Sequence, residues 1–337
     1  LMEFQGGDSS STGSKDTTSK DLLTVSSDTT NGTESHPPPT KSQTKKTETE
    51  KKPRRPKRGL SQKEKQNPIY SRRRLKLDAE AATGERITGT VITVPAHFNE
   101  AQRQATIAAG RLAELPVLGL VEEPVAAATY FGLGTRETER TLFVFDLGGG
   151  TLDATVLQAT PEGLFVLATE GSTNLGGKNF DELIMDIVRE QFRVQHRAEP
   201  GSDAESQQRL RKFATAAKME LSEPGRGVIT RSLLLSGQTL RVTIHRAQFE
   251  AAAEPWLEAA QVVCEDALKA AGMAWQSVDE VILTGGSSLV PCVERKVRDI
   301  SRLPQARVRR EQPHAAIAYG AALLAEQYHG QPRPAAP

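Results

Sequence analysis

The sequence predicts a mixed α/β domain, and three observations support this fold class. Short runs of β-branched and aromatic residues alternate with longer segments in which apolar residues recur at helical spacing. Two consecutive strand-like runs, residues 141–146 and 151–158, are joined by three glycines, which indicates an antiparallel turn and hence a mixed sheet. Other strand-like runs lead through glycine into a helix, and such junctions are where α/β folds bind ligands.

The elements follow in order from these patterns. The expected strands are short apolar runs bounded by proline, glycine or polar residues, at 90–94, 117–121, 141–146, 151–158, 164–169, 227–235, 239–244 and 279–283. The expected helices carry an apolar or small-residue face and lie at 99–115, 124–132, 179–193, 206–221, 247–271, 290–300 and 314–327. Residues 141–146 (TLFVFD) are the most strand-like segment, and the third strand of the meander follows at 164–169.

The N-terminal part has a different composition from the rest of the chain. Residues 1–70 contain nine apolar residues of the AVILMFWYC set and 21 serines and threonines, whereas 37% of the whole chain is apolar. Such a segment buries too little apolar surface to offset the entropy lost on ordering. We therefore expect a disordered basic tail at 1–71, a folded domain at 72–327 and a disordered C-terminal tail at 328–337.

Charge is also divided unevenly along the chain. Residues 1–80 carry 17 basic and 11 acidic residues, a net charge of +6, and residues 81–337 carry 26 and 31, a net charge of −5. The run Lys51–Arg58 could serve as a nuclear address or contact nucleic acid. A solvated basic linker is the favoured interpretation because the run has no interleaved aromatic residues. Nucleic-acid contact by the basic tail is therefore the less favoured interpretation and stays open.

The same composition limits the compartment and the class of protein. No apolar run reaches the ~18 residues that a membrane span needs, so no membrane association is expected. Two cysteines, Cys264 and Cys292, cannot form a disulfide framework, and no zinc-like spacing occurs. No secretory signal pattern is present at the start. A cytoplasmic location is expected, with a nuclear one open if the basic run is an address.

Residues 146–153 read Asp-Leu-Gly-Gly-Gly-Thr-Leu-Asp and carry the clearest chemical signal. Three successive glycines let backbone N–H groups approach an anion without obstruction by Cβ atoms. A carboxylate at the strand end before them can hold magnesium, usually through water, and a following hydroxyl can contact a terminal phosphate. A plain hairpin turn needs only one or two glycines and no flanking acids. The pattern therefore favours a phosphate site.

Residues 283–291 (LTGGSSLVP) form a second glycine turn, between a strand and a helix. Its N–H groups and the helix N-terminus can hold a phosphate or a nucleoside. Glycine at such a junction also occurs for packing alone, so this turn by itself leaves both interpretations open. Neither turn matches a P-loop or a G-x-G-x-x-G unit, which disfavours those nucleotide folds.

Residues 122–128 (EEPVAAA) place Glu123 at the start of an alanine-rich helix. The helix dipole favours an acidic residue there even without a catalytic role, so a structural explanation stays open beside a functional one. Residues 316–322 (AIAYGAA) have a similar face of small residues. Two such faces predict helices that cross closely at a hinge between lobes.

Seven segments carry a resemblance to a known family. They occur in order along the chain, at 91–109, 121–128, 144–153, 174–180, 217–222, 281–291 and 318–322. Together they resemble the nucleotide-binding domain of the heat-shock 70-kilodalton (DnaK-type) chaperones, within the actin-like ATPase superfamily. The resemblance covers residues 75–327, which is 253 of 337 residues.

This resemblance implies a two-lobed, ribonuclease-H-like ATPase fold that closes on ATP or ADP with Mg²⁺. It implies that Asp146 and Asp153 hold magnesium and a monovalent cation such as K⁺, mostly through water. It places Glu123 near the metal and the attacking water, and Thr151 at the γ-phosphate. The other nucleotide-binding positions that it implies are Gly148, Gly149, Gly150, Gly177, Lys218, Ser222, Gly285, Gly286 and Ser287.

The sequence also departs from the family pattern. The family's domain opens with an Asp-x-Gly-Thr-Thr phosphate hairpin and then supplies a catalytic lysine, and neither has a match in this sequence. Removing one stabilising donor from a transition state typically costs ~2.7–4 kcal/mol, so weak Mg–ATP binding and still weaker turnover are expected. At three further positions Leu289, Thr215 and His314 stand where the family has arginine, glutamate and aspartate.

The sequence thus favours an N-terminally incomplete ATP-binding module of a heat-shock-70-like chaperone, which assists protein folding through ATP binding and hydrolysis. J-domain co-chaperones and nucleotide-exchange factors are the partners that the resemblance implies. Two alternatives stay open: a non-catalytic module that binds co-chaperones, and a truncated or chimeric gene product without activity. The start at Leu1 and the abrupt change of composition favour a chimera.

Overall fold

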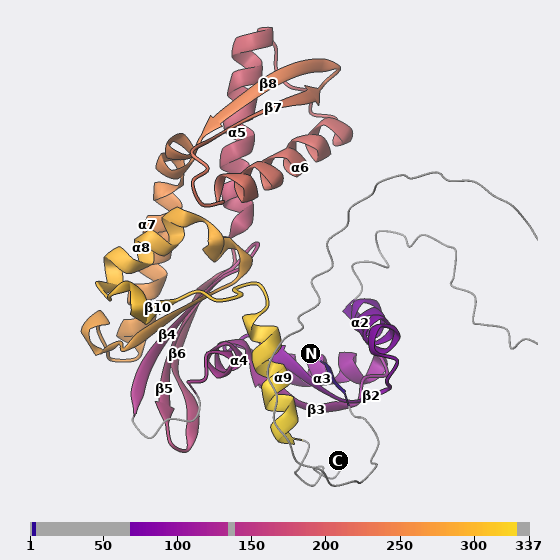
Figure 1. Cartoon of the computed structure of the whole chain (residues 1–337), viewed down its shortest axis with the longest axis vertical. Helices are drawn as coiled ribbons and strands as arrows, with labels where there is room; N and C mark the ends of the chain where they lie inside the picture. The colour runs from indigo at the N-terminus through magenta and orange to yellow at the C-terminus, as the bar shows by residue number, and fades with distance from the viewer. Residues whose placement is uncertain (1, 5–67, 134–138, 329–337) are drawn as a thin grey trace, which may run out of the picture. The chain divides into compact units, whose positions relative to one another are not determined.

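The structure of the chain is a computed structural model that describes residues 2–4, 68–133 and 139–328, all of which belong to one compact unit (Figure 1). Within these residues strands and helices are mixed, as the sequence predicts. Residues 1 and 5–67 of the expected tail at 1–71, and residues 329–337 of the expected C-terminal tail at 328–337, lie outside the described residues. No helix in the described part of the chain is long and apolar enough to cross a membrane.

The largest sheet in the described residues is a five-stranded mixed sheet (Figure 1). In spatial order its strands are β10 (Val308–Arg309), β9 (Glu280–Thr284), β4 (Arg140–Leu147), β5 (Leu152–Thr160) and β6 (Gly163–Ser172). β4, β5 and β6 run antiparallel to one another, which confirms the predicted meander. β9 runs parallel to both β4 and β10. The two glycine turns therefore leave the ends of adjacent strands.

The central strand β4 is buried on both faces, which explains its nearly continuous apolar sequence. Phe143, Phe145 and Leu147 point into the larger core, whereas Leu142 and Val144 point into a second core on the opposite face. Helices flank the larger core: α5 (Gly177–His196), α6 (Ala204–Leu221), α7 (Arg246–Ala270) and α8 (Pro291–Ser301). The hairpin of β7 (Val228–Leu235) and β8 (Gln238–His245) packs on α5 and α6.

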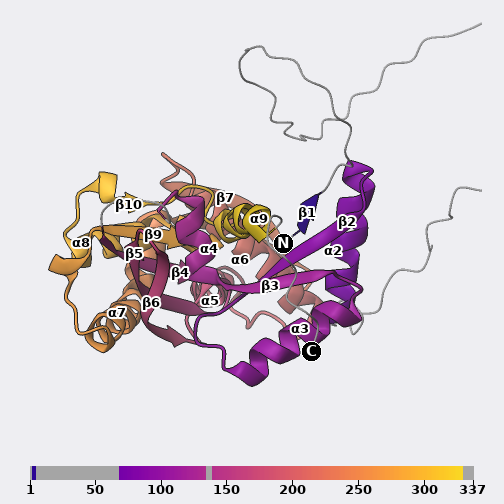
Figure 2. The same cartoon turned by 90° about the horizontal axis from the view of Figure 1, so that it is seen from below.

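A smaller sheet contains β1 (Met2–Phe4), β2 (Ile87–Val94) and β3 (Val117–Glu122) (Figure 2). β2 runs parallel to β3, and α3 (Glu100–Leu112) connects them, with a capping box at Asn99 that fixes its start. β1 pairs antiparallel with β2. The sequence predicts no regular structure before residue 72, so β1 and the first residues of α2 (Pro68–Thr83) differ from that expectation.

Two helices that are rich in small residues cross with their backbones close together, as predicted. α4 (Glu123–Tyr130) and α9 (Ala316–Tyr328) pack together, and both views show them side by side (Figures 1 and 2). A Cβ atom at Gly320 would overlap the carbonyl oxygen of Ala126. Glycine is therefore required for this separation of the helices. The crossing anchors the start of α4, where Glu123 lies.

Candidate functional site

Three carboxylates from different elements meet at the end of the five-stranded sheet. Asp146, near the end of β4, lies opposite Asp153 of β5 in the antiparallel register, and Glu123 begins α4. Burial and the charges of Glu123 and Asp153 raise the pKa of Asp146 from 3.8 to about 7. Burial and the charge of Asp153 also raise the pKa of Glu123. The three carboxylates that the sequence predicts are thus close enough to repel one another when they are charged.

A cavity of about 10 Å³, roughly the space for one water molecule, lies among these carboxylates. Its walls include Glu123, Asp146 and Asp153, together with Pro95 and Ala96. Among the described residues no group of three or more acidic, histidine or cysteine side chains is arranged to hold a metal ion. Carboxylate oxygens are nevertheless the donors that Mg²⁺ prefers, and Mg²⁺ keeps several waters when bound. The oxygen donors of these residues suit a hydrated magnesium ion, while the cavity itself has space for only about one water molecule.

His97 is a member of this cluster that the sequence did not indicate. Its Nδ1 atom lies 3.4 Å from Oδ1 of Asp153, and the imidazole lowers the pKa of that aspartate, although burial raises it more. Arg103 holds the turn that contains His97 by donating to the carbonyl oxygens of Ala96 and Phe98. Its guanidinium group also pairs with Glu122 at 2.6 Å. No local sequence signal marks the contact of His97 with Asp153, because it joins a turn between β2 and α3 to the distant strand β5.

The first glycine turn rests on the N-terminus of α5. The N–H of Gly177 donates to the oxygen of Gly148 at 3.0 Å, and the N–H of Lys178 donates to the oxygen of Gly149 at 2.8 Å. A Cβ atom at Gly176 would lie 2.5 Å from the nitrogen of Gly150, so the two segments approach at backbone distance. Thr151 follows the turn with an exposed side chain.

The second glycine turn lies directly against the first. Gly285 has φ of +79°, and a Cβ atom there would overlap Asp146 and the carbonyl of Leu147. Ser287 is buried, and its hydroxyl donates to the oxygen of Gly148 at 2.8 Å. Gly286 is exposed and has open space around it. Residues that are 139 positions apart in the chain thus form one surface.

A lysine of α6 completes this surface. The Nζ atom of Lys218 donates to the oxygen of Gly177 at 3.0 Å and pairs with Oδ1 of Asp181 at 2.8 Å. The hydroxyl of Thr215 donates to the other oxygen of Asp181 at 2.9 Å. Ser222 lies one helical turn further on, and its hydroxyl donates to the oxygen of Lys218. Lys218 therefore contacts the loops directly, whereas Ser222 adjoins them through the helix backbone.

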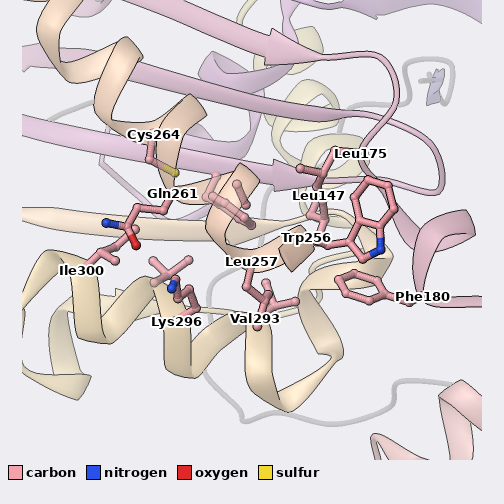
Figure 3. A pocket seen from close by; sticks show the side chains of 13 residues that line it. Leu147, Leu175, Phe180, Trp256, Leu257, Gln261, Cys264, Val293, Lys296 and Ile300 are labelled. Carbon is pink, nitrogen blue, oxygen red and sulfur yellow. The ribbon is translucent and has the colours of Figure 1, made fainter. Parts of the chain in front are cut away.

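An apolar cavity adjoins the residue before the first glycine turn (Figure 3). The side chains that line it include Leu147, Leu175, Phe180 of α5 and Trp256 of α7. Leu147 directly precedes Gly148, and Leu175 directly precedes Gly176. Cys264 also borders the cavity, and burial raises the pKa of its thiol. Leu147 and Leu175 are therefore fixed in the core beside their glycines.

A mixed sheet with converging glycine turns, flanking carboxylates and a facing lysine defines a nucleotide-binding domain of the actin-like ATPase class. The description of the matching family model is Hsp70 protein, and the match covers residues 69–335. The chain belongs to the Hsp70 family.

Curated relatives agree with this assignment. The chain is 41% identical over 268 residues to chaperone protein DnaK of each of two strains of Thermus thermophilus, an alignment that covers 77% of this chain and 43% of each relative. It is 40% identical over 261 residues to chaperone protein DnaK of Deinococcus proteolyticus, with 75% and 41% covered. The chain therefore spans less than half the length of these relatives.

Proposed function

We propose that this chain is the ATP-binding module of an Hsp70-like molecular chaperone and that it supports protein folding through ATP binding and hydrolysis. The observation that carries the proposal is the convergence of both glycine turns, the start of α5 and Lys218 next to three partly buried carboxylates. This arrangement supplies N–H donors for phosphates and oxygen donors for a hydrated cation in one place.

Each residue has a distinct proposed role. Gly149 and Gly150 present backbone N–H groups to the β- and γ-phosphates, and Thr151 donates its hydroxyl to the γ-phosphate. The N–H of Gly148 donates to the oxygen of Thr151 at 2.9 Å, so Gly148 holds the shape of the turn. Gly177 allows the phosphates to approach closely. Gly285, Gly286 and Ser287 border the nucleoside, and Lys218 and Ser222 approach its ribose.

The carboxylates have a separate role. Asp146 and Asp153 hold the waters of the metal ion, and Glu123 orients the attacking water. Mg²⁺, when bound, neutralises charge on the phosphates. K⁺ is proposed as a second cation at Asp153. J-domain co-chaperones and nucleotide-exchange factors are the proposed partners, and a cytoplasmic location is part of the same proposal.

Substitution of Thr151 separates hydrolysis from binding. We expect Thr151→Ala to slow single-turnover hydrolysis of ATP by ~10²-fold or more, because its hydroxyl acts on charge that develops in the transition state. The affinity for Mg–ATP, measured by equilibrium dialysis, should change much less. Thr230→Ala makes the same chemical change at an exposed position of β7 and should alter neither quantity. Equal losses of rate and affinity in Thr151→Ala would contradict the transition-state role, and absence of ATP binding in the unsubstituted chain would refute the proposed function.

A further inference from the structure

A pocket of about 540 Å³ lies outside the site described above. It is formed by the short 3₁₀ helix Trp275–Ser277, the end of α8 and the 3₁₀ helix Gln305–Arg307 with the segment before it. Ile300 and Leu303 supply apolar wall. None of the residues that line this pocket belongs to the glycine turns or to the carboxylate cluster.

The pocket is rich in unused hydrogen-bond donors. The guanidinium groups of Arg302 and Arg307 line it, and in the described part of the chain neither makes an ion pair or hydrogen bond. By contrast Arg295 of α8 pairs with Glu250 at 2.8 Å, and Arg310 pairs with Glu294 at 3.2 Å. The Nε1 atom of Trp275 is buried, so this N–H is not exposed to the pocket and is not one of these donors.

The remaining groups select among anionic ligands. Asp279 also lines the pocket, and one of its oxygens accepts the N–H of Thr141 at 2.9 Å. The negative charge of Asp279 repels a phosphate dianion more strongly than it repels a single carboxylate. The other carboxylate oxygen of Asp279 can accept a hydrogen bond from a peptide N–H. The ring of Trp275 packs on Phe143 at 4.7 Å between centroids, so it is engaged within the protein and is poorly placed to stack on a nucleic-acid base.

We propose that this pocket binds an acidic peptide segment of a partner protein, with carboxylates on Arg302 and Arg307 and an apolar side chain against Leu303 and Ile300. A guanidinium group forms two parallel hydrogen bonds to a carboxylate, which gives both strength and orientation. The apolar wall selects a segment in which leucine or a similar residue adjoins the acidic ones. The inference is independent of the nucleotide site.

Fluorescence polarisation with a labelled, C-terminally amidated hexapeptide of sequence Glu-Leu-Glu-Glu-Leu-Glu tests the proposal on the full chain. We expect saturable binding that weakens by about tenfold or more in the double variant Arg302→Ala, Arg307→Ala, since each lost charge-assisted pair removes a substantial part of the affinity. The double variant Arg211→Ala, Arg241→Ala removes the same charge from two other exposed arginines and should bind like the unsubstituted chain.

The chain has only two tryptophans, so indole N–H resonances give a second readout. The peptide should shift the resonance of Trp275 and leave that of Trp256, which borders the apolar cavity of Figure 3, unchanged. Equal affinity for a peptide with glutamine in place of glutamate would overturn the proposal, as would full binding by the Arg302/Arg307 variant. Binding of inorganic phosphate or a single-stranded oligonucleotide at these arginines, without peptide binding, would also overturn it.

Discussion

Asp146 shows how burial and neighbouring charge together set the chemistry of one side chain. Its pKa is raised to about 7 because it is buried and lies near Glu123 and Asp153. In the unfolded chain the same carboxyl has an ordinary pKa near 3.8. Between these two values the folded chain holds a proton that the unfolded chain has lost, so this group lowers stability progressively as pH rises from about 4 to about 7. A bound cation would remove this penalty.

We therefore expect Asp146→Asn to stabilise the metal-free chain at pH 8, on the order of 2–4 kcal/mol, because the amide carries no charge to bury. The gain should shrink as the pH falls toward 4. Urea unfolding in the presence of a chelator, followed by circular dichroism at several pH values, measures it. Asp266→Asn, at an exposed position of α7, is the control and should show little change at any pH. A pH-independent effect of Asp146→Asn would contradict the origin assigned to it.

The sequence identified most of the residues that meet at this site, since glycines and acids at fixed spacing within one strand–turn–strand unit are local signals. Asp146 and Asp153, for example, face each other across the turn that their own spacing predicts. His97 and Asp181 escaped notice because their contacts join elements that are distant in sequence. The placement of the individual nucleotide-binding residues stays a prediction until nucleotide binding is measured.

At the level of elements, the crossing of α4 and α9 is the most demanding contact. Helix propensity alone favours alanine over glycine within a helix by roughly 1 kcal/mol. At position 320 the close approach to Ala126 opposes this preference, because an added methyl group has no space. The two effects predict opposite signs for one substitution, which makes the crossing testable.

We expect Gly320→Ala to destabilise the chain by about 1–3 kcal/mol, the usual cost of overpacking, despite the better helix propensity of alanine. Denaturant unfolding followed by circular dichroism measures the change. Gly227→Ala, where an added Cβ meets nothing within 4 Å, is the matched control and should be nearly neutral. A stabilised Gly320→Ala chain would show that the helices are not held at this distance.

Long elements with a regular pattern were predicted well, and short ones were not. The core strands and the helices α5, α6 and α7 lie close to the expected ranges, because a strand buried on two faces or a long helix leaves a repeated apolar pattern. β10 has two residues and β1 has three, too few for any periodicity. Both depend on pairing with a neighbouring strand, which is a tertiary effect.

At the scale of the whole molecule, the sheet order is what makes a single site from distant segments. Parallel pairing of β4 with β9 places the turn after each strand at the same edge, and α5 closes over both. The sequence predicted a mixed sheet and a meander but not the insertion of β9 between β4 and β10, since strand order depends on contacts between residues far apart in the chain. Family membership and this geometry together support the proposed nucleotide site.

Isothermal titration calorimetry with Mg–ADP tests this account most directly, because it asks whether the converging turns form one binding site. A Cβ atom at Gly177 would lie 2.5 Å from the hydroxyl oxygen of Ser287 and 3.1 Å from Nζ of Lys218. We expect saturable binding to the 337-residue chain, an affinity about tenfold lower or worse in Gly177→Ala, and an unchanged affinity in Gly227→Ala. Absence of binding by the unsubstituted chain, or equal binding by Gly177→Ala, would contradict it.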